Sequence, residues 1–218
     1  MRILFDFLIC PMPWFVKRFL MNKILGFKLH KSAYIGLSIV NSSFLRMNKN
    51  SRIGHLNIFR NMKLVDIENN AIIGNLNWIS GEASNHILKK NSNTASLSIG
   101  THTAITNRHY LDCSGGFNIG TYSTFAGVYS TLLSHSIDID ESVQKMKAIE
   151  IGDYCFISSN CIFIGGSSIP NYSIVGAGSV IRNKFTESYF LYSGNPAKPI
   201  KNISTESLYF KRSAGFVN

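Results

Sequence analysis

Large apolar residues recur at every sixth position between Ile151 and Ile181. Small residues follow four positions after the first five of them: Cys155, Cys161, Ser167, Ser173 and Ser179. A period of six matches neither the 3.6 of an α-helix nor the 2 of a single β-strand. It predicts one short strand and one turn in every six residues. Three such units close a triangular coil of about 18 residues, and the coils stack into a solenoid.

The same register can be followed toward the N-terminus, with slips. Its large positions are Ile35, Ile53, Phe59, Val65, Ile67, Ile73, Ile79, Ile99, Ile105, Leu111, Ile119 and Phe125. These positions predict about six stacked coils. Residues 82–96 are rich in Asn, Ser and Lys, break the repeat, and are expected to loop outward.

One interruption is longer than the others. The coil that begins at Ile119 should close at Ile137, but the repeat restarts only at Ile151, 14 residues later. The segment from Asp138 to Glu150 is polar and is predicted to project from the solenoid, with His135 at its base. A long insertion on a rigid repeat scaffold is a common place for function.

The N-terminal segment predicts a short amphipathic helix. Pro13 precedes it and Gly26 ends it, and Val16, Phe19, Leu20 and Ile24 share one side. We expect that side to cap the open first coil. The alternative is that residues 13–25 rest through their basic side on a membrane surface. Ile3–Cys10 is interrupted by Asp6 and lacks a cleavage site, so we do not interpret it as a signal peptide, and no apolar run reaches the length of a membrane span.

The predicted fold class is therefore an all-β solenoid with a helical cap. The expected divisions are a cap over residues 1–31, a β-helix over 32–186 with a projecting loop at 138–150, and a C-terminal extension over 187–218.

The formal net charge of +10 is concentrated at the two ends of the chain. Residues 1–31 contain six Lys or Arg and one acid, and residues 182–212 contain six and two. This distribution lacks the continuous basic face of a nucleic-acid-binding protein. It suits an anionic cofactor at one end and an anionic surface at the other. The four cysteines have no metal-binding or disulfide spacing, and Cys155 and Cys161 are expected inside the coils, so a reducing, cytoplasmic location is the default.

Three segments resemble the hexapeptide-repeat acyltransferases, most closely the sugar and polysaccharide O-acetyltransferases. They are Ile151–Asn160 (IGDYCFISSN), Val175–Ile181 (VGAGSVI) and Gly194–Lys201 (GNPAKPIK). The resemblance implies a left-handed parallel β-helix, a homotrimer, acetyl-CoA as acyl donor without a metal, and a saccharide acceptor. It also allows a position at the inner face of a membrane that carries a lipid-linked acceptor.

His135 is the candidate catalytic base. A sugar hydroxyl is a poor nucleophile until its proton is removed, and a histidine near neutrality can accept that proton. The resemblance places the matching histidine before a projecting loop, and it assigns the backbone N–H of Ser159 to the oxyanion of the intermediate. The chain departs from the common pattern at Phe156 and Ser158. No nucleophile elbow is visible, so direct transfer is favoured over an acyl-enzyme.

The acceptor and coenzyme residues are assigned mainly through the resemblance. Candidates for the acceptor are Asn107, Arg108, His109 and Asp138, although His109 also falls on an inward position and can equally be a core histidine. Asp138, Asp140 and Glu141 are the nearby candidates for the partner that orients His135. The coenzyme candidates are the small residues Gly176, Ala177 and Gly178 and the cations Arg182, Lys184, Lys198 and Lys201.

Other functions remain open at this stage. N-acyl transfer to an amino sugar or acetylation of an antibiotic would use the same machinery. A γ-carbonic-anhydrase-type zinc site needs three convergent histidines, which the spacing of His102, His109 and His135 does not match. A solenoid that serves only as an assembly scaffold is the non-enzymatic alternative.

Overall fold

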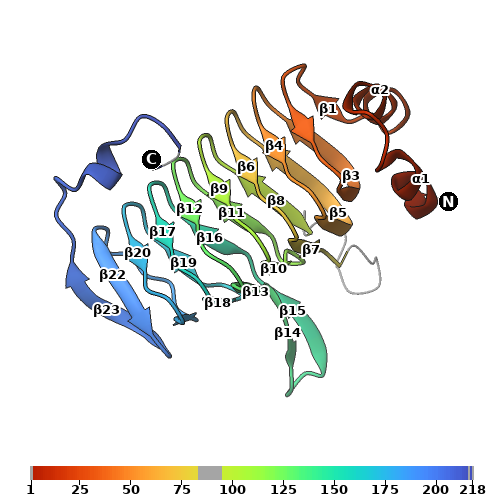
Figure 1. Ribbon diagram of the computed structural model, residues 1–218. Coiled ribbons are helices and arrows are strands. Elements are labelled where there is room, and N and C mark those ends of the chain that lie inside the picture. The colour runs from red at the N-terminus through yellow and green to blue at the C-terminus, as the bar shows by residue number, and fades with distance from the viewer. Residues whose placement is uncertain (1, 83–94, 216, 218) are drawn as a thin grey trace.

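The computed structural model describes residues 2–82, 95–215 and 217. Short strands wrap into stacked triangular coils, with two helices at one end and an antiparallel hairpin at the other (Figure 1). The predicted loop at 82–96 lies largely outside the described residues. None of the described helices is long and apolar enough to cross a bilayer.

Two of the three faces of the coil belong to one 12-stranded sheet, because the long strand β5 bends around the corner between them. Its strands are β1 (Lys28–Leu29), β3 (Ile39–Met47), β5 (Ile58–Ile67), β7 (Trp78–Ser80), β8 (Ser96–Ile99), β10 (Tyr110–Asp112), β11 (Phe117–Ile119), β13 (Thr131–Leu133), β16 (Ile149–Ile151), β18 (Ile162–Ile164), β19 (Ser168–Ile169) and β21 (Val180–Ile181).

The third face is a nine-stranded sheet in which only the last strand is antiparallel to its neighbour. It comprises β2 (Tyr34–Ile35), β4 (Arg52–Ile53), β6 (Ile72–Ile73), β9 (Ala104–Ile105), β12 (Thr124–Phe125), β17 (Phe156–Ile157), β20 (Ile174–Val175), β22 (Phe190–Gly194) and β23 (Ala197–Asn202). This face has more layers than the six or so coils expected. The extra layers come from the first and last coils, whose sequences do not follow the six-residue repeat. β22 still continues the stack through the buried Tyr192.

The six-residue register is confirmed as the pattern of the core. Its large residues point inward, and Ile53, Ile105, Phe125, Phe163 and Ile181 are each 0% exposed. The parallel pairing of Phe125 with Ile105 and Ile157 places like positions directly above one another. Packing along the axis therefore follows from the sequence period.

The three corners of the coil have different chemistry, and we name them by it. The hairpin corner comprises residues 113–116, 134–148, 165–167 and 182–184, and the asparagine corner comprises 54–57, 74–77, 106–109, 126–130, 158–161 and 176–179. The aromatic corner carries a ladder of stacked rings with centroids 4.8–5.3 Å apart: His102, Tyr122, Tyr154, Tyr172 and Tyr189.

The C-terminal tail covers the aromatic corner. Beyond β23 it forms the 3₁₀ turn η1 (Leu208–Lys211), and the Tyr209 hydroxyl donates to the carbonyl of Cys155 at 3.0 Å. The guanidinium of Arg212 lies 3.8 Å from the centre of the Tyr209 ring. Since the ring faces in the ladder are already covered by one another, this corner is a structural seam.

The N-terminal cap consists of α1 (Arg2–Ile9) and α2 (Trp14–Ile24), and α1 was not foreseen from the sequence. The expected helix and its role as a cap are found, but the face predicted to be buried was only partly correct, since Leu20 packs against the core and two other members do not. Lys17 and Met21 face the first coil, whereas Phe19 and Ile24 are 61% and 60% exposed. The cause is the ammonium of Lys17, which donates to the carbonyl of Gly36 at 2.7 Å and so satisfies an acceptor of the open coil end.

Candidate active site

The projecting segment is a β-hairpin that begins at His135. It is formed by β14 (His135–Asp138) and β15 (Val143–Met146), and the coil resumes at the buried Ile149. The insertion therefore ends earlier than the expected Glu150. The N–H of Lys147 donates to the carbonyl of Ser134 at 2.9 Å, which closes the base of the hairpin.

His135 is paired with a buried carboxylate from the preceding coil. The distance between its Nδ1 and Oδ2 of Asp112 is 2.7 Å, and the side chains of His135 and Asp112 are 43% and 4% exposed. With Nδ1–H donating to the carboxylate, Nε2 is the basic nitrogen and faces outward. The imidazole is thus half-exposed while its partner is shielded from water.

Asp112 is held as an anion by a dense set of donors. It accepts from the N–H and hydroxyl of Ser114 at 3.1 and 2.5 Å, and from the N–H of Ser134 at 2.8 Å. Burial alone would raise the pKa of Asp112, but the hydrogen bonds from Ser114 and His135 outweigh it and hold this pKa below its ordinary value. A permanently charged carboxylate is therefore fixed behind the imidazole.

A pocket of about 160 Å³ opens beside the imidazole. Its lining residues include Arg60, Glu82, Asp112, His135 and Gln144. The guanidinium of Arg60 forms no salt bridge with any described residue, so it offers hydrogen-bond donors to a bound molecule.

The sequence candidates for the acceptor lie elsewhere. Asn107, Arg108 and His109 lie on the asparagine corner, across β10 from Asp112. Asn107 accepts the N–H of Asn75 through its side-chain oxygen at 2.7 Å, and Arg108 holds a left-handed turn with φ +59°. Asp138 does lie in the hairpin, but it pairs with Lys145 at 2.5 Å and not with His135.

His109 is a core histidine. It is 2% exposed, accepts the N–H of Ser130 through Nδ1 at 3.1 Å, and lies 3.0 Å from the Thr106 hydroxyl through Nε2. Asn57 and Asn77 occupy the same place in earlier coils, and Asn77 accepts the N–H of His109 at 2.9 Å. Burial lowers the pKa of His109 to about 4, so the ring is neutral at physiological pH. The alternative of a structural histidine is the one that the geometry favours.

Ser159 also lies on the asparagine corner, so within one chain it is separated from His135 by the strands between the two corners. Side chains cap the outer backbone N–H groups of this corner in the early coils, as Asn75 does for His55 at 2.7 Å. This capping ends at Asn107. In the later coils the N–H groups of Gly127, Ser159 and Ala177 donate to no described residue and form an open row of donors.

The coenzyme candidates are divided among three places. Gly176, Ala177 and Gly178 continue the asparagine corner, with Gly178 in open space at φ +71°. Arg182 and Lys184 lie on the hairpin corner, where they line a recess of about 620 Å³ with Lys147, Gly165 and Gly166. Lys198 and Lys201 are exposed on β23 at the C-terminal end.

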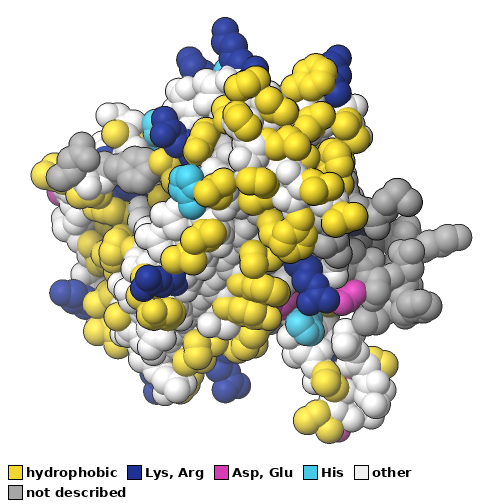
Figure 2. Space-filling view, turned by 45° about the vertical axis from the view of Figure 1, so that its right-hand side comes forward, with side chains coloured by type: hydrophobic (Ala, Val, Ile, Leu, Met, Phe, Trp, Pro, Cys, Tyr) yellow, Lys and Arg dark blue, Asp and Glu magenta, His cyan; other side chains and the backbone are white. Residues whose placement is uncertain are grey.

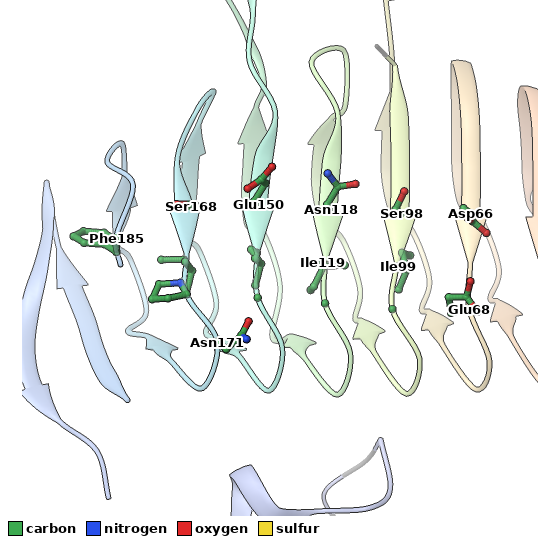
Figure 3. A pocket seen from close by; sticks show the side chains of 16 residues that line it. Asp66, Glu68, Ser98, Ile99, Asn118, Ile119, Glu150, Ser168, Asn171 and Phe185 are labelled. Carbon is green, nitrogen blue, oxygen red and sulfur yellow. The ribbon is translucent and has the colours of Figure 1, made fainter. Parts of the chain in front are cut away.

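Another recess, of about 590 Å³, lies on the face formed by β8, β11, β16 and β19. Figure 3 shows its outward side chains in a row: Asp66, Ser98, Asn118, Glu150 and Ser168. It contains no histidine or cysteine and is shallow, so it offers no counterpart to the His135 pair. Across the described residues, no group of three His, Cys, Asp or Glu side chains is close enough together to hold a metal ion.

The partner of His135 was missed from the sequence. Asp112 lies three residues after the acceptor candidate His109, but it was not singled out. The register pairs Leu111 with Leu132 and Asp112 with Leu133, which places Asp112 beneath the start of the hairpin. Because 21 is not a multiple of six, the strict register does not align these positions, and the pair becomes visible only in the stacked coils.

Similar solved structures identify the architecture. Over 86% of this chain and 90% of the other, the polysialic acid O-acetyltransferase OatWY superposes with a TM-score of 0.62 at 17% identity. The hexapeptide-repeat-containing acetyltransferase VCA0836 from Vibrio cholerae superposes over 91% and 86% with a TM-score of 0.51 at 16% identity. The fold is the left-handed parallel β-helix of the hexapeptide-repeat acetyltransferases. The predicted fold class and the resemblance in fold are confirmed, and no family model matches the chain.

Proposed function

We propose that this chain is an acetyl-CoA-dependent O-acetyltransferase that acts on a hydroxyl of a saccharide, such as a cell-surface polysaccharide or its precursor. The observation that carries the proposal is the exposed imidazole of His135, backed by the buried carboxylate of Asp112 at 2.7 Å, at the base of the projecting hairpin. The acceptor class is taken from OatWY, which acts on polysialic acid.

The proposed reaction needs no covalent enzyme intermediate. Nε2 of His135 takes the proton of the acceptor hydroxyl as its oxygen attacks the thioester carbonyl carbon. The N–H of Ser159 stabilises the resulting oxyanion. When the C–S bond breaks, the proton on Nε2 passes to the sulfur of coenzyme A. Asp112 holds the ring orientation and stabilises the imidazolium that forms between the two proton transfers.

A second copy of the chain is part of the proposal. His135 lies on the hairpin corner, and the open N–H row of Ser159 and Ala177 lies on the asparagine corner, so one chain alone does not bring them together. Packing of one copy's asparagine corner against the hairpin corner of the next would complete the site. The exposed aromatic residues Trp78, Tyr110 and Tyr129, which are 36%, 47% and 60% exposed, lie on and beside the strands between these corners and suit such an interface. A homotrimer would then hold three sites.

The coenzyme would extend along the later coils from this site, with its phosphates toward the basic C-terminal end. Gly176, Ala177 and Gly178 allow close approach of the pantetheine arm, and Arg182, Lys184, Lys198 and Lys201 supply cations. A position in the cytoplasm, where acetyl-CoA is made, belongs to the same proposal.

The direct test measures release of coenzyme A from acetyl-CoA with a panel of sugars, nucleotide sugars and polysaccharides. We expect turnover with a hydroxyl acceptor, and a fall of about 10²-fold or more in His135→Ala with coenzyme binding retained. The amino-sugar members of the panel test N-acylation. A purified variant that keeps more than about a tenth of wild-type turnover would remove His135 from the base role.

A further inference from the structure

The N-terminal cap exposes a second apolar face that the fold does not use. Six large side chains of α1 and α2 are each 56–71% exposed: Leu4, Phe7, Leu8, Phe15, Phe19 and Ile24. We call this set the outer cap face. Its members on α1 follow i, i+3, i+4 spacing and Phe15 and Phe19 follow i, i+4, so each helix presents one apolar stripe outward.

This exposure is a consequence of how the cap is anchored. Ile9 and Met21 are 2% exposed and face the core, and Asp6 accepts from the side-chain amide of Asn41 at 2.9 Å. Lys17 is fixed to Gly36 at 2.7 Å. The inner side of the cap therefore combines apolar contacts with the polar contacts of Asp6 and Lys17, and a second set of apolar side chains is left pointing outward.

The first 65 residues, which include the cap, are strongly basic, and the two acids that follow them, Asp66 and Glu68, are paired with Arg46. The chain contains a single acidic residue before Asp66, and this residue, Asp6, is 1% exposed. Eleven Lys and Arg residues lie in the same stretch. The first 65 residues therefore sum to +10, and the rest of the chain sums to zero because the acids of its middle coils balance its basic C-terminal segment.

A cationic recess adjoins this face. It has a volume of about 580 Å³, and Lys23, Lys28, His30 and Asn22 are among its lining residues. Lys23 directly precedes Ile24, the member of the outer cap face at the end of α2. Figure 2 shows hydrophobic side chains gathered over the upper part of the molecule, at the height of the two helices, with Lys and Arg at the rim.

We propose that the outer cap face docks this protein onto an anionic lipid bilayer. Phe, Leu and Ile side chains enter the boundary between headgroups and acyl chains, as in interfacial amphipathic helices, while Lys23 and Lys28 contact lipid phosphates. Charge complementarity favours a membrane over a second copy of the chain, because two copies would bring like charges together at this face. The inference is independent of the proposed reaction.

In the docked orientation the stack of coils extends from the membrane surface into solution, because the cap closes one end of the stack (Figure 1). In the sheet order, β13 lies four strands beyond β3 (through β5, β7 and β10), and at about 4.8 Å per layer His135 would stand about 20 Å above the first coil.

The test is co-sedimentation of the full-length protein with vesicles of phosphatidylcholine alone and of phosphatidylcholine with phosphatidylglycerol. We expect strong binding to the mixed vesicles that weakens with salt, and at least about tenfold weaker partition for Phe15→Ser/Phe19→Ser. The Lys23→Glu/Lys28→Glu variant should bind mixed vesicles at least about tenfold more weakly than the wild type, and its binding to neutral vesicles should change little.

The matched control is Ile137→Ser/Ile139→Ser in the hairpin, where the two side chains are 69% and 87% exposed. This variant should bind vesicles like the wild type. The proposal is overturned if the wild type does not bind mixed vesicles, or if the control loses as much binding as the cap variant. It is also overturned if Phe15→Ser/Phe19→Ser changes only the mass measured by light scattering, which would assign the face to contact between copies. Thermal unfolding within about 2 °C of wild type verifies that each variant folds.

Discussion

Oδ2 of Asp112 accepts both the backbone N–H of His135 at 3.0 Å and its ring Nδ1 at 2.7 Å. One oxygen thus fixes the main chain at the start of the hairpin and the orientation of the imidazole. Because the carboxylate is also held by Ser114 and Ser134, the ring cannot turn without breaking several hydrogen bonds. The pair is prepared before any substrate arrives.

Replacing Asp112 by Asn should lower turnover by about 10²-fold or more, with little change in the Michaelis constant for acetyl-CoA. An amide cannot stabilise the imidazolium as a carboxylate does, so the acid limb of the pH–rate profile should also move to lower pH. Ser114→Ala, which removes a donor to Asp112 and leaves the charge in place, is the matched control and should lose less than about tenfold. Equal losses in the two variants would assign Asp112 a purely structural role.

Mixed oligomers test whether the site lies between copies. Ala177 is exposed on the asparagine corner, so Ala177→Trp should cover the open N–H row without disturbing the core. Each of His135→Ala and Ala177→Trp should be inactive alone, but their co-expression should restore activity, because some interfaces would then combine two intact halves. The assay is release of coenzyme A by the tagged and purified mixture. No recovery from a verified mixed oligomer would place the whole site in one chain.

Charge reversal at Lys198 and Lys201 should raise the Michaelis constant for acetyl-CoA more than it lowers turnover, because phosphate contacts are equal in the ground and transition states. The same measurement on Arg182→Glu/Lys184→Glu tests whether the phosphates bind in the recess on the hairpin corner. Lys49→Glu, near the capped end, is the control and should leave the Michaelis constant for acetyl-CoA unchanged. The pair whose reversal raises this Michaelis constant more is the pair that contacts the phosphates.

His109 should make the stability of the protein depend on pH. Its pKa is about 4 in the folded chain against an ordinary value of 6.5, so the unfolded chain takes up the proton first as the pH falls. Stability present above pH 6.5 is then lost progressively down to about pH 4, by about 3 kcal/mol in total.

Asn is the natural replacement at this position, since Asn57 and Asn77 fill it in neighbouring coils. Denaturant unfolding of His109→Asn at pH 7.5 and 4.5 should show a smaller difference than the wild type. His30→Asn, at an exposed position, should keep the wild-type difference. If His109→Asn shows the same difference in unfolding free energy between pH 7.5 and 4.5 as the wild type, other groups control acid unfolding.

Lys17→Met should destabilise the cap although it makes the helix more apolar. It removes one of the two donors to the carbonyl of Gly36, which then keeps only the N–H of Ser38 at 2.8 Å, at a cost of about 0.5–1.5 kcal/mol. For a chain of this size, each kcal/mol corresponds to about 2–4 °C in Tm, so thermal unfolding detects the change. Lys23→Met on the exposed side should leave the Tm unchanged. A Lys17→Met variant as stable as the wild type would show that the hydrogen bond contributes nothing.

The repeat could be predicted from the sequence because the interior of a coil accepts only large residues on its faces and small ones at its corners. Ile151, Phe163 and Val175 follow that rule and are buried. His135 could be found because it stands where the repeat breaks. Its partner, by contrast, depends on pairing between coils, which a reading of neighbouring residues does not contain.

The wrong expectation for the cap and the open alternative for His109 were decided by the same kind of contact. Hydrophobicity alone placed Phe19 and Ile24 inside and left Lys17 outside, and the sequence left His109 as either an acceptor-binding or a core residue. In both cases a polar main-chain group determined the outcome: the carbonyl of Gly36 accepts from the ammonium of Lys17, and the N–H of Ser130 donates to His109. Such demands of the main chain become visible only when the coils are stacked.

The closed base of the hairpin has a consequence for how such proteins can change. Gly165 donates to Leu133 at 2.8 Å and Gly166 donates to Ala148 at 2.9 Å, so the next coil contacts this corner as though Ser134 were followed directly by Lys147. The hairpin tip can therefore be lengthened, shortened or exchanged without altering the pairing of any coil. Acceptor preference could diverge through this single exchangeable module while the scaffold and the His135 pair beneath it remain the same.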